Sequence, residues 1–300
     1  MADQEGIQAR LNNIRSVEPI LGAMRTIALG SWQAALNRQT RIQYYSQRLA
    51  ELLPPVVQRL GAQKRRRLLS RTRSRATPST IEVLVIGSER GLCGAFNSSL
   101  VQYVEEALEQ YVAEGMGVEI SVLGSRAKRG LERGGHELLW NRPLPMTTLP
   151  GNELAREMVH TWLRRYEAKE LDGVDVIYNT YRSSTVYEPI TTHLVPPPPP
   201  TRPNVRPGDA AASWPPPYID TDPIQLYTRL ILLWTTTETY RVLLDSAAAE
   251  HSARYQLMEG ATQNAGRLID ELTLALQAAR QHAITSEMQE LAVGAGLLGT

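Results

Sequence analysis

The sequence predicts an α/β protein in which an antiparallel coiled coil of long N- and C-terminal helices accompanies a doubly wound, Rossmann-like α/β domain. Two observations predict the coiled coil: residues 4–60 and residues 223–298 each carry apolar side chains every three or four positions. A third predicts the α/β domain, since the middle of the chain alternates short apolar runs with amphipathic segments. At ~1.5 Å per residue the C-terminal helix is on the order of 110 Å long, so it needs a partner helix or must protrude into another structure.

The N-terminal helix is predicted from one apolar stripe through residues 4–60. Pro19 is expected to kink this helix or to remove a backbone hydrogen bond, and Pro54 and Pro55 are expected to bend or end it. The stripe consists of Ile7, Leu11, Ile14, Val17, Leu21, Met24, Ile27 or Ala28, Trp32, Ala35, Ile42, Tyr45, Leu49, Leu52 and Val56.

Strands and helices alternate in the middle of the chain. Residues 81–88 form a short, β-branched apolar run, which is typical of a buried parallel strand. A helix over 97–115, a strand over 118–123, a helix over 153–169 and a strand over 173–181 follow. This order predicts an open sheet with helices on its faces.

The C-terminal helix has no proline after Pro223, and its apolar stripe includes several alanines that would allow a second helix to approach closely. Packing of each long helix on the central domain is the alternative, but that domain is too small to cover either helix. The predicted domains are a coiled-coil helix over 1–60, a basic linker over 61–80, the α/β domain over 81–195, a Pro-rich linker over 196–217 and a coiled-coil helix over 218–300.

Composition argues against several classes of protein. The formal net charge is +1, so no global field favours nucleic acid or an anionic membrane. Cys93 is the single cysteine, which excludes an intrachain disulfide, and no apolar run is long enough to span a bilayer. The N-terminus lacks the features of a signal peptide, so we expect a cytoplasmic chain. The basic segment 64–75 could bind nucleic acid, but a solvated loop is the preferred interpretation.

One turn has features of a ligand site. Residues 88–97 (SERGLCGAFN) follow the first strand, where Gly91 and Gly94 would let a phosphate approach the backbone. The turn matches neither standard phosphate motif, so tight turn geometry is the preferred interpretation, with Arg90, Gly91, Cys93 and Gly94 as its structural residues. Cys93 has no adjacent base and is expected to be a buried thiol. The histidines have no ligand spacing, so neither a metal nor another cofactor is expected.

Several segments carry one specific pattern. Residues 88–97 are similar to S-D-R-G-L-C-G-x-x-N, with Glu89 in place of aspartate, and residues 218–223 to a Y-E-P-D-P stretch. The N-terminal helix matches at Ile7, Arg10, Leu11, Ile14, Ile20, Ala23 and Met24, and the last helix at Glu250, Ala253, Arg254, Met258, Ala261, Thr262, Asn264, Ala265, Arg280, Gln281, Ile284, Thr285, Glu287, Glu290, Gly294 and Ala295. Together these segments resemble the gamma subunit of F-type ATP synthases, the central rotor shaft.

The resemblance implies a non-catalytic subunit that couples ion-driven rotation to ATP synthesis. In that family the coiled coil enters the hexamer of alpha and beta subunits, where catalysis takes place on the beta subunits. The α/β domain grips the epsilon subunit and the membrane ring of c subunits. We therefore expect a peripheral protein at the cytoplasmic face of a bacterial cell membrane, with no direct membrane span and no nucleic-acid partner. The resemblance places Met24, Arg25, Arg280, Gln281, Thr285 and Glu287 at the hexamer interface, although Met24 also fits a plain core position of the coil.

Departures from the family pattern leave alternatives open. Ser31, Gln33 and Ala34 stand where the family has basic residues, so this helix offers less positive charge to the acidic lever loops of the beta subunits. Arg25 and Arg38 compensate for that loss only in part. A paralogous subunit of a specialised ion-translocating F-type ATPase is therefore an alternative, and a stand-alone phosphate-binding α/β protein is a less favoured one.

Overall fold

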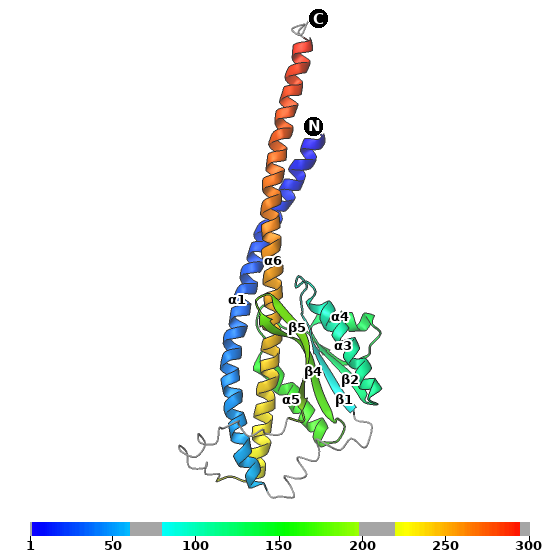
Figure 1. Cartoon of the computed structure of the whole chain (residues 1–300), viewed down its shortest axis with the longest axis vertical. Helices are drawn as coiled ribbons and strands as arrows, with labels where there is room; N and C mark the ends of the chain where they lie inside the picture. Colours follow the sequence, from blue (N-terminus) through cyan, green and yellow to red (C-terminus); the bar gives the residue numbers. More distant parts are fainter. Residues whose placement is uncertain (1, 61–79, 198–219, 295–300) are drawn as a thin grey trace. The chain divides into compact units, whose positions relative to one another are not determined.

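The structure, a computed structural model, describes residues 2–60, 80–197 and 220–294 (Figure 1). It contains two compact units: residues 30–253 form one, and residues 1–29 with 254–300 form the other. Nearly all of the basic linker and of the Pro-rich linker lies outside the described residues, and Thr80 is the first residue of β1. Of the described helices, none combines the length and hydropathy that a bilayer crossing requires.

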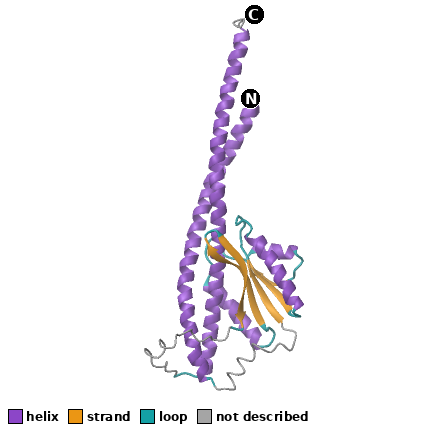
Figure 2. Cartoon of the chain, in the orientation of Figure 1, coloured by secondary structure: helices purple, strands orange, loops and turns teal. Residues whose placement is uncertain are grey.

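One five-stranded sheet forms the middle of the larger unit (Figure 2). Its spatial order is β3-β2-β1-β4-β5, with every neighbouring pair parallel except β4 and β5. The strands are β1 (Thr80–Ile86), β2 (Gly117–Leu123), β3 (Leu138–Arg142), β4 (Gly173–Ser183) and β5 (Val186–Val195). β1, β2 and β4 coincide with the three predicted strands, whereas the sequence did not predict β3 or β5.

Helices cover both faces of this sheet, which confirms the predicted doubly wound class. α3 (Phe96–Ala113) and α4 (Ser125–Arg133) bury Val83, Val85 and Val122 against one face. α5 (Asn152–Glu167) packs on the other face, where Trp162 is buried with Leu84 and Val176. The sequence predicted α3 and α5 to within two residues at each end and missed α4.

The second face of the sheet also packs against a long helix. α6 (Pro223–Gly294) contributes Tyr240, Val242, Leu243 and Leu244 to the same apolar cluster as α5. Packing of a long helix on the central domain, the less favoured alternative, is therefore correct for this part of α6. α6 contacts the α/β domain as well as α1 (Ala2–Arg59).

In the larger unit α1 and α6 run antiparallel. Gln39 bonds to Asp245 and Ser46 bonds to Glu238. The residue number on α6 therefore falls by as much as the residue number on α1 rises. Below these bonds Leu49, Leu53, Val56 and Leu230 form an apolar cluster. α1 continues through Pro19, Pro54 and Pro55 without a break, so the expected end at Pro54 and Pro55 is wrong. Packing of the flanking Leu53 and Val56 offsets the bond that proline removes.

In the smaller unit the same two helices bury a narrow seam. Leu11 and Ala28 on α1, and Met258, Ala265 and Leu276 on α6, are buried. Ile27 is 65% exposed and Ala28 is 1% exposed, which decides between the two residues proposed for that stripe position. Apolar side chains remain exposed on both helices of this unit, namely Val17, Ile20, Ile27, Leu257, Leu268, Leu274, Ile284, Met288, Leu291 and Val293.

Candidate functional site

The turn over residues 88–97 connects β1 to α3 and is closed by its own side chains. The Asn97 amide donates to Ser88 Oγ over 2.8 Å and to Cys93 Sγ over 3.3 Å, while its oxygen accepts from Ser88 N at 3.0 Å. Ser88 Oγ in turn donates to the carbonyl of Arg90 over 2.7 Å. Leu92 and Gly94 have φ angles of 62° and 60°, which fits the tight geometry predicted for this segment.

This network supports the turn interpretation over the phosphate interpretation. Asn97 and Ser88 direct their polar atoms into the turn. Phe96 is fully buried with Ala249 and Cys93 where α3 begins, so apolar side chains occupy the start of the helix. Cys93 is a buried thiol, as predicted. Arg126 of α4 lies over Gly91, since a Cβ added at Gly91 would meet its guanidinium at 3.2 Å.

Glu89 ties this turn to two neighbouring segments. Its carboxylate accepts from Ser125 N at 3.1 Å, from Ser125 Oγ at 2.5 Å and from Leu144 N at 3.0 Å. Burial pushes the pKa of Glu89 upward, but the hydrogen bonds from Ser125 and Leu144, together with the charge of Arg129, outweigh it and lower that pKa below its ordinary value. The residue that departs from the family's aspartate therefore caps the start of α4.

Replacing Glu89 with alanine is expected to lower the free energy of unfolding by about 1–2 kcal/mol at pH 7, because three donors lose a charged acceptor. The pKa of Glu89 is depressed in the folded protein, so its contribution is complete above the unfolded pKa of about 4.3 and is lost as pH falls through the folded value. Urea unfolding at pH 7 and at about pH 3, well below the unfolded pKa, measures both effects. Glu137→Ala, at an exposed position of the same domain, is the control. A deficit that stays constant between the two pH values would contradict this role.

The residues expected at the hexamer interface lie in the smaller unit. Arg280, Gln281, Thr285 and Glu287 are exposed on α6, and Thr285 Oγ1 donates to the carbonyl of Gln281 over 2.8 Å. Figure 1 shows the C-terminal end of α6 extending past the N-terminal end of α1 in this unit.

Met24 and Arg25 lie on α1 in that same unit, and both are half-buried. Arg25 Nη1 donates to Glu259 Oε2 over 2.8 Å, and this bond lowers the pKa of Glu259. The sequence did not reveal that Arg25 is paired with α6, because its partner is more than two hundred residues away. Glu259 therefore partly neutralises the positive charge that Arg25 contributes to this surface.

Comparisons with known proteins agree along the whole chain. A family model described as ATP synthase matches residues 3–298. An ATP synthase gamma chain of a Methylobacterium species is 30% identical over 304 residues, covering 99% of this chain and 100% of its own length. The gamma chains of Nostoc punctiforme and Erythrobacter litoralis are 27% and 26% identical, each again covering 99% of this chain and 100% of the relative.

Solved structures share the fold. A chain from the Euglena gracilis mitochondrial ATP synthase aligns with a TM-score of 0.63 at 15% identity, over 100% of this chain and 97% of its own. A chain from the central stalk and c-ring of the Tetrahymena thermophila mitochondrial ATP synthase aligns with a TM-score of 0.57 at 21% identity, over 81% and 99%. These likenesses confirm the predicted combination of long terminal helices with an α/β domain. By the family model and the full-length relatives, this chain belongs to the family of ATP synthase gamma chains.

Proposed function

We propose that this chain is the rotating central shaft of an F-type ATP synthase and has no catalytic site of its own. Full-length membership of the gamma-chain family carries this proposal. The fold suits the role, because helices from opposite ends of the chain pair with each other and both contact the α/β domain, α6 over the larger apolar area. Torque applied to that domain is thereby carried into α6.

The partners follow from this role. The alpha and beta subunits form the hexamer around the two helices of the smaller unit, and the epsilon subunit and the c-ring hold the α/β domain. The shaft sits at the cytoplasmic face of the cell membrane as a peripheral protein. Catalysis takes place on the beta subunits, which respond to the asymmetry of the shaft.

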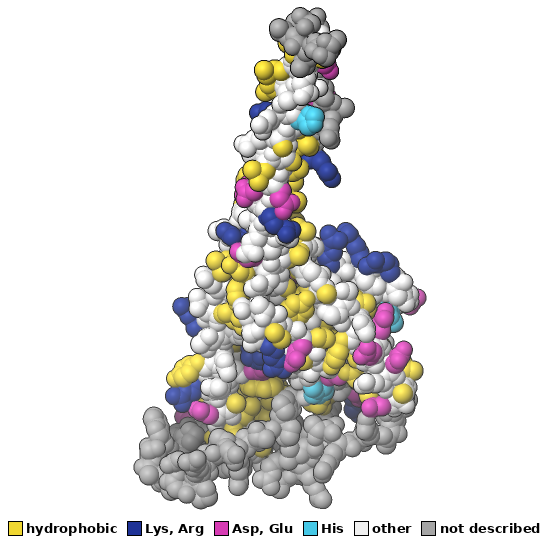
Figure 3. Space-filling view, turned by 45° about the horizontal axis from the view of Figure 1, so that its top comes forward, with side chains coloured by type: hydrophobic (Ala, Val, Ile, Leu, Met, Phe, Trp, Pro, Cys, Tyr) yellow, Lys and Arg dark blue, Asp and Glu magenta, His cyan; other side chains and the backbone are white. Residues whose placement is uncertain are grey.

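Exposed apolar side chains in the smaller unit support a covered position for it. Leu274, Ile284, Met288 and Leu291 are all more than half exposed on α6. Figure 3 shows hydrophobic side chains along this end of the chain. An unpaired apolar surface of this kind is typical of a protein contact. Surrounding it with hexamer subunits would remove it from water.

The contacts of this unit with the hexamer are assigned to Arg280, Gln281, Thr285 and Glu287 of α6. Met24 and Arg25 of α1 complete this set. Arg280 and Gln281 are exposed donors that can bond to loops of the catalytic subunits. Ser31, Gln33 and Ala34 are uncharged, and Arg25 is engaged by Glu259, so shape contributes more than positive charge along this stretch of α1.

Reconstitution with alpha and beta subunits tests the proposal. The chain is expected to co-purify in a 3:3:1 assembly, taken from the family stoichiometry, and to rotate during ATP hydrolysis. Arg280→Ala should slow hydrolysis about tenfold, as the loss of one charge-assisted hydrogen bond predicts. Arg267→Ala removes a similar exposed arginine from α6 and serves as the matched control. If the chain did not assemble with alpha and beta subunits, the rotor function would be refuted. Equal rates of ATP hydrolysis for the two variants would refute only the role of Arg280.

A further inference from the structure

Asp245 on α6 is a buried carboxylate that joins three elements of the larger unit. It is 3% exposed. Oδ2 accepts from Thr180 Oγ1 at 2.8 Å, and Oδ1 accepts from Tyr181 N at 3.2 Å and from Gln39 Nε2 at 3.1 Å. Thr180 and Tyr181 belong to β4, and Gln39 belongs to α1. One side chain therefore connects both shaft helices to the central sheet.

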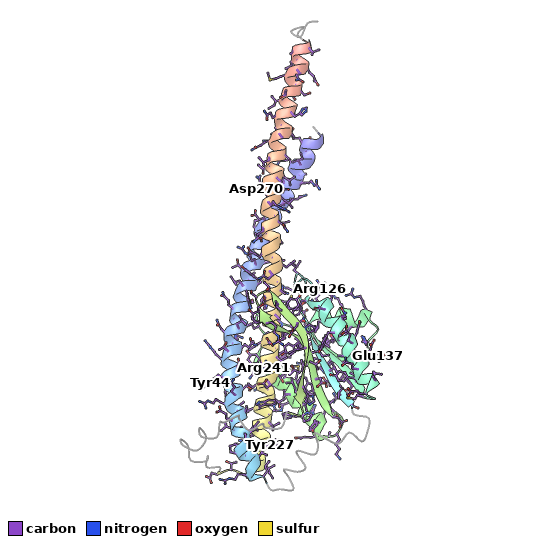
Figure 4. All side chains as sticks on the ribbon, viewed as in Figure 1. Tyr44, Arg126, Glu137, Tyr227, Arg241 and Asp270 are labelled. Atoms are coloured by element: carbon purple, nitrogen blue, oxygen red, sulfur yellow. The ribbon has the colours of Figure 1, made fainter. Side chains whose placement is uncertain are left out.

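A second polar group lies one heptad along the same helix pair. Glu238 accepts from Ser46 of α1 and from Arg241 Nε, the latter at 2.8 Å. Figure 4 shows Arg241 where α6 passes the sheet. With Asp245 these side chains line a cavity of about 420 Å³ between α1, α6 and β4. The polar layer thus has an open side through which water reaches it once the bonds break.

Apolar clusters flank this polar layer. Leu243 and Leu244 of α6 pack on the sheet with Val176, and Ala249 packs with Phe96 and Cys93. Such contacts are non-directional and tolerate small slides of one surface over another. Three hydrogen bonds, from donors on β4 and α1, to one buried carboxylate on α6 allow only one arrangement. A lost acceptor leaves the donors unpaired.

We infer that Asp245 is a positioning residue that fixes the angular position of the α/β domain on the shaft, so that torque passes between them without slip. The inference rests on the proposed rotor function. The apolar clusters hold the two parts together. The bonds of Asp245 decide their register, together with the 2.6 Å bond from Ser252 Oγ of α6 to the Ser184 carbonyl. Without those bonds, load would turn the α/β domain slightly against α6.

Isosteric and truncating variants separate geometry from charge. In Asp245→Asn the amide oxygen can accept from Tyr181 N and Gln39 Nε2 while the amide nitrogen donates to Thr180 Oγ1, so the register is kept. Asp245→Ala removes all three bonds, and Thr180→Val removes one. Thr191→Val on β5 is the matched control for Thr180→Val, because Thr191 is exposed and its hydroxyl bonds to Tyr103 and, within the described ranges, not to the shaft helices.

Two measurements on the assembled complex test the inference. Hydrogen exchange of the peptide over residues 178–184 reports release of the Tyr181 amide, and ATP synthesis driven by an ion gradient reports torque. Asp245→Ala should speed that exchange about tenfold or more and lower the synthesis rate at least about threefold, with assembly and hexamer ATP hydrolysis unchanged. Thr180→Val should fall in between, while Asp245→Asn and Thr191→Val should match the parent chain in synthesis.

Each contrary outcome has a distinct meaning. Faster exchange in Asp245→Ala with synthesis at the parent rate would overturn the positioning role. Unchanged exchange would show that the bonds do not hold the two parts, and a loss of synthesis in Asp245→Asn equal to that in Asp245→Ala would assign the effect to charge instead of register. A parent complex that makes no ATP would refute the rotor function and the coupling role with it, while the exchange measurement would still test the three bonds.

Discussion

Replacing Glu82 with alanine is expected to lower the free energy of unfolding of the α/β domain by about 3–5 kcal/mol. Glu82 on β1 is 1% exposed, and Oε1 accepts from Ser121 Oγ at 2.8 Å and from Trp140 Nε1 at 2.9 Å. Oε2 accepts from Arg165 Nη1 at 2.8 Å. Among the described residues, the alanine variant leaves this arginine with the more exposed Glu119 and Glu170 as its acidic partners. It also leaves the buried Ser121 hydroxyl and the half-buried Trp140 indole N–H without this acceptor. Tryptophan fluorescence during urea unfolding measures the loss.

The matched control is an ion pair of similar length at the surface of the same domain. Arg142 Nη1 donates to Glu157 Oε2 over 2.6 Å, but both side chains are more than half exposed. Glu157→Ala should therefore change the free energy of unfolding by less than about 1 kcal/mol. If Glu82→Ala were as mild as Glu157→Ala, the buried network would not contribute as its geometry implies.

Periodicity predicted the elements with long or strongly apolar patterns and missed the short amphiphilic ones. β1 is buried along nearly its whole length, so its apolar run was easy to find. α4 buries only Ala127 and Leu131 and is otherwise rich in arginine, which resembles a polar loop in sequence. β5 is an edge strand with half-buried and exposed residues up to the buried Leu194 and Val195 at its end, and it contains Pro189, so its pattern is weak.

The seam of the coil was predicted in outline but not residue by residue. Ala28 and Ala35 are buried, whereas the larger Val17 and Tyr45 nearby are nearly half exposed. A wide apolar face does not show which of its side chains contact the partner helix. The repeat of a straight helix and the seven-residue repeat of a coiled coil differ by only about 20° per heptad, so both patterns fit the same sequence. If other subunits cover the apolar side chains that face away from the partner helix, one helix carries several apolar stripes, each for a different contact.

The polar contacts that position the domain could not be predicted from sequence spacing. Glu89 bonds to residues in two other connections of the sheet, and Asp245 bonds to residues of α1 and β4. Each partner is distant in the chain, so no local motif marks it. The family resemblance identified the glycine-containing turn as specific, and only the fold shows that a carboxylate from it caps α4.

Gly124→Ala is expected to destabilise this same junction by about 3 kcal/mol or more. Gly124 precedes α4 with φ 95°, and a Cβ there would lie 2.6 Å from the carbonyl oxygen of Gly87 and 2.9 Å from that of Ser88. Both obstacles are backbone atoms, so the turns after β1 and β2 must separate, in addition to the strain of a positive φ.

Gly135→Ala isolates the strain of a positive φ, because Gly135 has φ 83° and nothing lies within 4 Å of an added Cβ. It should cost only about 1–2 kcal/mol. The difference between the two urea midpoints then measures how tightly the turns are packed. Separation of the turns would also weaken the bond from Arg126 N to the Ser88 carbonyl, which is 3.0 Å long. Faster amide exchange at residues 124–128 in Gly124→Ala alone is therefore expected, and equal exchange in both variants would show that the turns can part without loss.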